Sequence, residues 1–313
     1  DSFPTVHRNL ALAYYNKRSD FDRAKKELEK AFALDETDSR VLLELDQLYK
    51  KLGTAFDKRL ALYENHKTVT EERDDAMLEY VTLYNLSGKP EKAYELIMGH
   101  SFRPWEGAEG RISAQYKIAL LEMAKKAMAA KDWEKAEGLL EKALVYPENL
   151  GEGKLEGTKD NNIYYYLGVV KESLGKEEAS RCFALAELGD NEPAGAMYYY
   201  DQPADMILYK GMAKMKLGKR KEAFACFGKL LDYGERHLND EVKNDFFAVS
   251  LPDFLIFEDD MDKRNKAHCY YLMGLANLGL GNNQLAAEKF DKALEYDFNH
   301  QNCRIYKALA ERK

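Results

Sequence analysis

Residues 270–296, which read YYLMGLANLGLGNNQLAAEKFDKALEY, decide the fold. Gly274 is followed seven residues later by Gly281, and Ala286 and Phe290 come after it. Small residues let two facing helices approach closely, and an aromatic side chain four residues on fills the space between them. A glycine such as Gly281 suits the position just after a helix, where φ is positive. The stretch therefore predicts two helices joined by a tight turn.

The same ladder recurs along the chain, and each copy has an anchor residue at the position of Ala286. Residues 211–230 match closely, with Gly218, Ala223 and Phe227 at the corresponding places. The seven anchors are Ala24, Lys58, Ala93, Ala136, Ala179, Ala223 and Ala286. Because one such hairpin cannot bury its apolar face alone, neighbouring hairpins must stack. The sequence predicts an all-α superhelix, or solenoid, of about seven helical hairpins.

The composition agrees with a helical chain and narrows the choice of partners. Val, Ile and Thr total 23 residues against 40 Leu and 35 Ala, which disfavours a β-rich fold. The net charge of −7 disfavours nucleic acid and an anionic membrane surface as partners. No apolar stretch reaches the roughly 18 residues that are needed to span a bilayer. We therefore expect neither nucleic-acid nor membrane binding.

The four cysteines are Cys182, Cys226, Cys269 and Cys303, and none belongs to a C-x-x-C pair. This spacing disfavours a zinc site, which stays the alternative interpretation. Buried free thiols are typical of a reducing compartment. We predict a cytoplasmic protein with no metal ion and no other cofactor.

The ladders resemble tetratricopeptide (TPR) repeats, and the resemblance covers most of the chain. It implies stacked helix pairs and a binding role, and the TPR fold hosts many unrelated binding roles. The repeats are expected at 6–35, 39–66, 74–100, 114–146, 162–187, 205–233 and 267–297, followed by a terminal helix at 300–313. The prediction is a single domain, 1–313, that is a piece of a longer protein.

Four inserts interrupt the repeats. The gaps between successive anchors are 34, 35, 43, 43, 44 and 63 residues, whereas the plain TPR period is 34. The extra residues fall after the second helix of a pair, at 101–113, 147–161, 188–204 and 234–265. We therefore expect the inserts along one edge of the array. An additional helix in the last insert is predicted from its apolar spacing, at Leu238, Val242, Phe246 and Val249.

Strings in and beside the inserts resemble one family of large bacterial proteins. They are PWEGAEG, YPENLGEGKLEG, MYYYDQPADM, YGERHLNDE and DFFAVSLPDFLIFEDDMDKRN. In that family an uncharacterised N-terminal region, expected to be a β-sandwich, precedes a C-terminal TPR region. The resemblance covers roughly residues 70–300, and it implies a bacterial source and a missing N-terminal part. It implies no established activity.

The inserts combine aromatic side chains with carboxylates, which is typical of recognition surfaces. The binding candidates there are Arg103, Trp105, Glu106, Tyr198, Tyr199, Tyr200 and Asp201. Paired carboxylates beside aromatic platforms also suit a sugar site, for which Glu109, Glu148, Glu152 and Asp205 are further candidates. A carbohydrate-active multidomain protein is therefore the alternative function, with carbohydrate as the ligand. The remaining interpretation is that the inserts only pack back on the repeats.

Two further patterns concern cations. His237 and Glu241 stand four residues apart and would share a helix face, but no third metal ligand stands at a suitable spacing. The acidic run 258–262, EDDMD, matches a calcium loop in charge alone, because it lacks the glycine and the glutamate of an EF-hand. We predict no metal site and no catalytic residue.

The first helices of the repeats should line the inner face of the superhelix. By register these positions hold Tyr165, Val169, Leu208, Met212, Met215, Tyr271, Leu275 and Leu278. Such an apolar stripe would take an apolar helix or a neighbouring domain, unless insert residues fold inward and fill it. Tyr165, Met212 and Tyr271 are the binding candidates within it. The sequence predicts a non-enzymatic protein–protein or interdomain scaffold, whose partner is its own missing N-terminal domain or another polypeptide.

Overall fold

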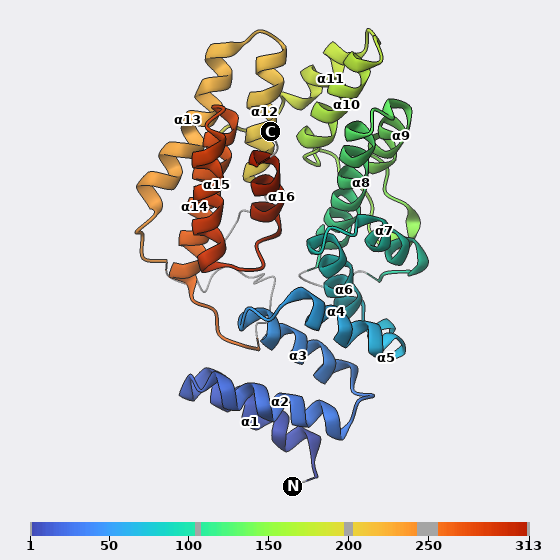
Figure 1. Ribbon diagram of the computed structural model, residues 1–313, viewed down its shortest axis with the longest axis vertical. Helices are drawn as coiled ribbons and strands as arrows, with labels where there is room; N and C mark the ends of the chain where they lie inside the picture. The colour runs from blue at the N-terminus through green and yellow to red at the C-terminus, as the bar shows by residue number, and fades with distance from the viewer. Residues whose placement is uncertain (1, 104–107, 197–202, 243–255, 312–313) are drawn as a thin grey trace. The chain divides into compact units, whose positions relative to one another are not determined.

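The computed structural model describes residues 2–103, 108–196, 203–242 and 256–311 (Figure 1). Within these ranges every regular element is a helix. The α-helices are α1 (Pro4–Arg18), α2 (Phe21–Leu34), α3 (Ser39–Lys51), α4 (Phe56–Asn65), α5 (Lys67–Glu71), α6 (Asp74–Leu86), α7 (Pro90–Gly99), α8 (Arg111–Ala129), α9 (Trp133–Ala143), α10 (Asn161–Ser173), α11 (Ala179–Ala186), α12 (Ala204–Lys216), α13 (Arg220–His237), α14 (Met261–Gly279), α15 (Asn283–Tyr296) and α16 (Gln301–Ala310). One turn of 3-10 helix, η1 (Glu148–Leu150), lies between α9 and α10.

Consecutive helices pack as antiparallel pairs. Contacts join α1 to α2, α3 to α4, α6 to α7, α10 to α11, α12 to α13 and α14 to α15. The alanine anchors on five of the second helices, such as Ala93 and Ala223, are fully buried. The prediction of an all-α fold built from TPR-like helix pairs is confirmed.

The chain divides into two compact units. The first comprises Asp1–Ala119, Tyr146–Gly153 and Phe246–Asp259, and the second comprises Leu120–Val145, Lys154–Asp245 and Asp260–Lys313. The border between them falls inside α8. The last segment of the first unit is described from residue 256 onward, and there it lies against α1.

The tight turn inside each helix pair has one residue with positive φ. Five of the turns have a glycine at this position, as the sequence predicts for Gly281, and their φ lies between 64° and 80°: Gly53, Gly88, Gly175, Gly218 and Gly281. Two turns have a residue with a Cβ instead, namely Ser19 at φ 50° and Lys131 at φ 59°. At Lys131 the N–H donates to the Met128 carbonyl at 3.0 Å, and the next N–H donates to the Ala127 carbonyl at 2.9 Å. This is the Schellman motif, in which a left-handed residue closes the helix.

We expect Lys131→Gly to stabilise the chain by about 1 kcal/mol. An L-residue pays roughly 1–2 kcal/mol for the left-handed conformation, and glycine avoids that cost. The exposed Lys126, inside α8, provides the matched control, because Lys126→Gly should destabilise the helix by about 1 kcal/mol. Urea denaturation followed by circular dichroism measures both changes. A loss of stability in Lys131→Gly would contradict the assignment of this turn.

Glycine and phenylalanine meet inside the pairs of the second unit. A Cβ added to Gly211 would lie 2.3 Å from a ring carbon of Phe227, and one added to Gly274 would lie 2.4 Å from Phe290. The same arrangement joins Gly168 to Phe183. Because these rings are buried, a larger residue in place of the glycine would collide with them. The glycines therefore let the two helices of each pair come close together.

The second hairpin departs from the predicted register by one residue. In five of the other six turns the helix begins two residues after the left-handed position, as α7 does at Pro90. α4 begins three residues after Gly53, at Phe56, and α11 begins four residues after Gly175, at Ala179. The anchor position of the second hairpin is consequently Arg59, which is fully buried, and not Lys58, whose side chain is 52% exposed. The prediction of Lys58 as an anchor is wrong because the turn has one more residue.

The described part of the last insert does not contain the additional helix that the sequence predicts. α13 continues to His237, and residues 238–242 form a turn and irregular backbone. The predicted helix through Leu238 and Val242 is therefore absent at these positions, and its other two residues lie outside the described ranges. None of the helices described here is both long enough and apolar enough to cross a lipid bilayer.

Candidate functional site

The apolar stripe predicted for the first helices is partly open in the second unit. Tyr165 and Val169 of α10 and Met212 of α12 are half-buried, and Met215 of α12 is 42% exposed. Leu208, one turn before Met212, is fully buried. Since α10 contacts α12 directly, these side chains belong to adjoining helices. We call Tyr165, Val169, Met212 and Met215 the α10/α12 face.

Tyr165 is held in this face by other rings. Its ring centroid lies 5.4 Å from that of Tyr166, 5.6 Å from that of Tyr209 and 6.0 Å from that of Phe183. Burial, with a smaller contribution from Tyr166, raises the pKa of Tyr165 to about 12. The hydroxyl therefore stays protonated at neutral pH, and the side chain offers an apolar ring with a hydrogen-bond donor.

The part of the stripe that lies on α14 is covered by the chain itself. Tyr271 and Leu275 are fully buried. Tyr306 of α16 places its ring 6.2 Å from that of Tyr271 and 6.1 Å from that of Tyr209, and its hydroxyl donates to Asp205 Oδ2 at 2.7 Å. α16 therefore lies over first-helix residues with an aromatic side chain as its anchor.

The candidate residues of the inserts lie mostly outside the described ranges. These are Trp105, Glu106, Tyr198, Tyr199, Tyr200 and Asp201. Arg103 is described and exposed, and its backbone N–H donates to Asp74 Oδ2 at 2.8 Å. The same carboxylate accepts from His100 Nε2 at 2.7 Å through its other oxygen.

Two residues of the second insert, Asn149 and Glu152, form hydrogen bonds with the backbone just before the first insert and within its last residues. Asn149 Nδ2 donates to the carbonyls of Ile97 and His100 at 2.6 and 2.9 Å. Glu152 accepts from the N–H groups of Gly110 and Ser113 at 2.8 and 3.0 Å, at the start of α8. A carboxylate in this position satisfies free N–H groups of a helix N-terminus. Glu152, a carboxylate candidate for the sugar site, thus has a capping role.

The acidic run 258–262 consists of carboxylates with protein partners. Glu258 and Asp259 pair with Lys17 and Lys51, at 3.5 and 2.6 Å respectively. Asp260 accepts from the Lys263 N–H at 3.0 Å and thereby caps α14, and Asp262 accepts from the Val242 N–H at 2.9 Å. Each carboxylate of the run therefore has a separate partner within the protein.

His237 and Glu241 do not share a helix face, because α13 ends at His237. His237 Nδ1 instead lies 2.6 Å from Asp240 Oδ2. In the part of the chain that the structure describes, no group of three or more His, Cys, Asp or Glu is arranged to hold a metal ion.

All four cysteines are buried free thiols, as the sequence predicts. Burial raises the pKa of Cys182 and Cys226, and it raises the pKa of Cys269 to about 12. Because the thiolate is the reactive form, these positions favour packing over chemistry.

A charged network is buried in the first unit. Arg59 Nε and Nη2 donate to the two oxygens of Asp46 at 2.7 and 2.8 Å, and both side chains are fully buried. Glu79 lies 3.5 Å from Arg59 and 3.1 Å from Lys50. Burial opposes the charge of Glu79, but the cations of Lys50 and Arg59 outweigh burial and lower its pKa to about 2. The network joins α3, α4 and α6.

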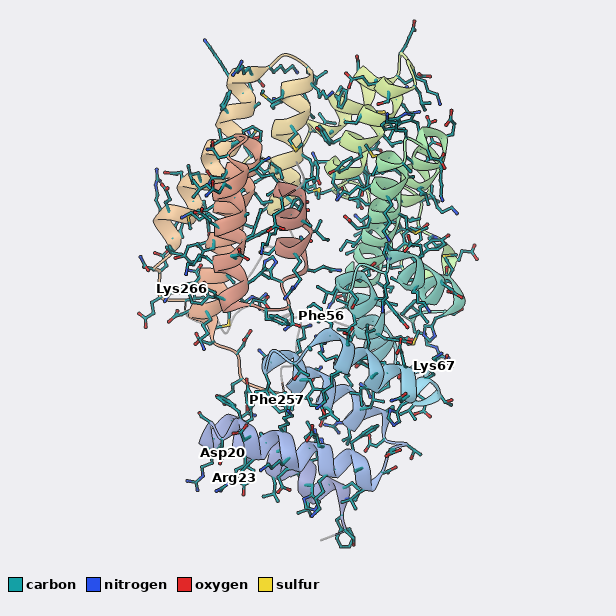
Figure 2. All side chains as sticks on the ribbon, viewed as in Figure 1. Asp20, Arg23, Phe56, Lys67, Phe257 and Lys266 are labelled. Atoms are coloured by element: carbon teal, nitrogen blue, oxygen red, sulfur yellow. The ribbon has the colours of Figure 1, made fainter. Side chains whose placement is uncertain are left out.

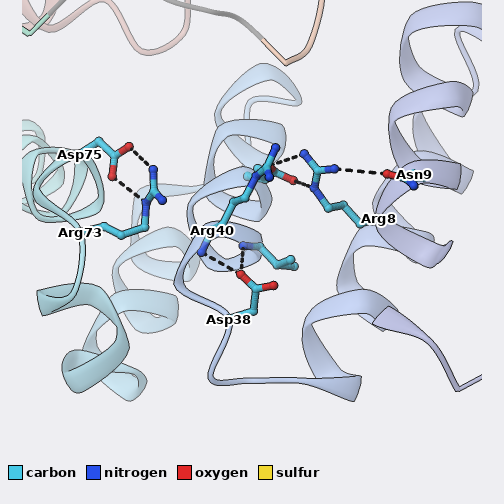
Figure 3. A network of polar contacts seen from close by, with 8 residues as sticks. Arg8, Asn9, Asp38, Arg40, Arg73 and Asp75 are labelled. Atoms are coloured by element: carbon cyan, nitrogen blue, oxygen red, sulfur yellow. Dashed lines mark hydrogen bonds and ion pairs between the residues drawn. The ribbon is translucent and has the colours of Figure 1, made fainter. Parts of the chain in front are cut away.

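A second polar network of the first unit links α1 to α3 (Figure 3). Arg8 donates to both oxygens of Glu44 at 2.5 and 2.6 Å, and Arg40 Nε donates to Glu44 Oε1 at 2.9 Å. Nearby, Arg73 and Asp75 form a bidentate pair at 3.0 and 2.7 Å. Arg8 and Arg40 therefore share the buried Glu44 carboxylate, and Arg73 has Asp75 as its own partner.

One contact of the first unit has no counterpart among the sequence predictions. The end of the last insert, Ile256–Asp259, lies against α1 and reaches Lys51 of α3. Phe257 is only 2% exposed there (Figure 2). The two partners are separated by about 240 residues, and no local pattern in either of them indicates the contact.

No family model matches the chain. Among solved structures, the chain is similar to a tetratricopeptide repeat protein from Parabacteroides merdae, at 14% identity and a TM-score of 0.45, with 99% of each chain covered. It is also similar to PilW, a type IV pilus biogenesis factor, at 16% identity and a TM-score of 0.39, over 73% of this chain and 92% of that one. The TPR-like character of the fold rests on the chain's own helix pairs and turns.

Proposed function

We propose that the chain is a non-enzymatic protein-interaction scaffold and that the α10/α12 face is its binding surface. The observation that carries the proposal is the arrangement of Tyr165, Met212 and Met215 on adjoining first helices, half-buried or exposed. Aromatic and methionine side chains are enriched at protein interfaces, and methionine adapts to the shape of its partner. On α14, the corresponding residue Tyr271 is already covered by a helix of the chain, α16. The same mode of contact, an apolar helix anchored by an aromatic side chain, suits the α10/α12 face.

The partner that this face fits is a polypeptide with an apolar helical surface. It is either the remainder of a longer polypeptide to which this chain belongs or a second protein. Two carboxylates that the carbohydrate alternative would use have structural roles, because Glu152 caps α8 and Asp205 accepts from the Tyr306 hydroxyl.

Site-specific photocrosslinking in the native host tests this function. We expect p-benzoylphenylalanine at position 215 to give a light-dependent adduct with one polypeptide, which mass spectrometry identifies. The exposed Lys292 of α15 provides the control position, which should give no such adduct. Met212→Asp should reduce the yield from position 215 at least tenfold, because it places a charge inside the contact. Equal products from positions 215 and 292 would rule out the α10/α12 face as the binding surface.

A further inference from the structure

The segment Ile256–Asp259 is bound by the first unit through its backbone. Asn16 Nδ2 donates to the Ile256 carbonyl at 2.8 Å, and Asn16 Oδ1 accepts from the Glu258 N–H at 3.0 Å. One amide side chain therefore satisfies the backbone groups on both sides of Phe257. In peptide recognition, hydrogen bonds to the backbone of the bound segment commonly give affinity, and pockets for its side chains select its sequence.

Phe257 is the buried side chain of this segment. Its ring packs edge-on against Tyr15 of α1, with centroids 4.9 Å apart and planes at 65°. The Tyr15 ring in turn lies 5.0 Å from that of Phe21 at the start of α2. A nearly fully desolvated aromatic residue is the usual anchor of an interface, and edge-to-face ring pairs add to its stability.

The acidic residues after Phe257 meet lysines from two helices. Asp259 Oδ1 lies 2.6 Å from Lys51 Nζ of α3, and the two side chains are 30% and 23% exposed. Glu258 lies 3.5 Å from Lys17 of α1, where both side chains are exposed and the pair contributes little. Burial raises the pKa of Tyr15, and the carboxylates of Asp259 and Glu258 raise it further, as expected for a ring that they flank. The surface thus complements an aromatic residue followed by acidic residues.

We propose that Tyr15, Asn16 and Lys51 form a binding site for a segment of a partner polypeptide in which phenylalanine is followed by two acidic residues, and that Ile256–Asp259 occupies this site as an intramolecular competitor. Backbone hydrogen bonds, an aromatic anchor and ion pairs are all contacts that a separate chain can make equally well. A tethered segment acts at a high effective concentration, so the partner binds well only when that segment is released. This site is separate from the α10/α12 face, and either proposal can fail without the other.

A fluorescent peptide with the sequence of residues 255–260, LIFEDD, tests the proposal by fluorescence anisotropy. Phe257→Ala in the full chain removes the anchor of the internal segment. We expect this variant to bind the peptide saturably and at least tenfold more tightly than the unaltered chain. Adding Asn16→Ala to it should weaken binding at least tenfold, whereas adding Asn9→Ala, an exposed asparagine of the same helix, should not.

Two altered peptides test whether the site recognises the aromatic ring and the acidic side chains. LIAEDD, without the aromatic anchor, should bind at least tenfold more weakly than LIFEDD. LIFQNN should bind more weakly and lose its dependence on salt, because it cannot pair with Lys51. If Phe257→Ala does not fold, the double variant Glu258→Lys with Asp259→Lys releases the segment by charge repulsion and serves in its place. Peptide binding no tighter to the released chain than to the unaltered chain would overturn the proposal.

Discussion

Replacing Arg59 with Met is expected to lower the free energy of unfolding by about 3–5 kcal/mol, the usual cost of removing one partner of a buried ion pair. Arg59 and Asp46 are both fully buried, and two hydrogen bonds of 2.7 and 2.8 Å join them. Without the guanidinium, the buried Asp46 carboxylate loses both hydrogen bonds that Arg59 donates. Glu79 also loses one of its cations. Urea denaturation followed by far-UV circular dichroism measures the loss.

Lys58→Met is the matched control, because it changes a neighbouring cation to the same residue. The Lys58 side chain is 52% exposed and lies 3.4 Å from Glu29, so its removal should cost less than about 1 kcal/mol. Asp46→Leu combined with Arg59→Met should recover much of the lost stability, because it removes both charges of the pair and fills the space. If Arg59→Met costs no more than Lys58→Met, Arg59 does not form a buried pair in solution.

The anchor of the same hairpin is a position that the repeat pattern of the sequence predicts wrongly. A fixed spacing from Gly53 predicts Lys58 as the anchor, and the extra residue in the turn moves the anchor to Arg59. A signal for this shift is present in the sequence. Glu79 interrupts the otherwise apolar run 76–81, and a carboxylate at a core position requires a cation beside it. A repeat ladder based on small residues alone does not use that signal.

The other features that the sequence does not predict depend on contacts between residues that are distant in the chain. Helical periodicity places Tyr165, Met212 and Tyr271 on the first helices α10, α12 and α14, as their register predicts. That α16 covers Tyr271 depends on where a later helix returns, and no periodicity within α14 encodes it. The contact between Asn16 and Ile256–Asp259 is still harder to predict from the sequence, because it joins two segments that are distant in the chain. Local pattern therefore predicts the helix pairs, and the candidate sites depend on tertiary contacts.

Phe227→Ala is expected to lower the free energy of unfolding by about 3–5 kcal/mol, the range for truncating a buried phenylalanine. The Phe227 ring is fully buried between two glycines of different helices. A Cβ added to Gly211 of α12 would lie 2.3 Å from this ring, and one added to Gly279 of α14 would lie 2.4 Å from it. Neither glycine has a side chain that can fill the cavity left by the ring, so the cost should fall toward the upper end of the range. Phe224→Ala in the same helix is the control, because Phe224 is 39% exposed and its loss should cost less than about 1 kcal/mol.

A third variant tests whether the Phe227 ring lies against Gly211. Gly211→Ala alone should cost about 1–3 kcal/mol, because the added methyl group collides with the ring. In the Phe227→Ala background the collision is gone, and alanine is about 1 kcal/mol more favourable than glycine inside a helix. The second substitution should then be neutral or stabilising. Gly228→Ala, at a helical glycine with open space around it, should stabilise the chain in both backgrounds. An equal cost of Gly211→Ala with and without the ring would show that the glycine does not set the distance between these helices.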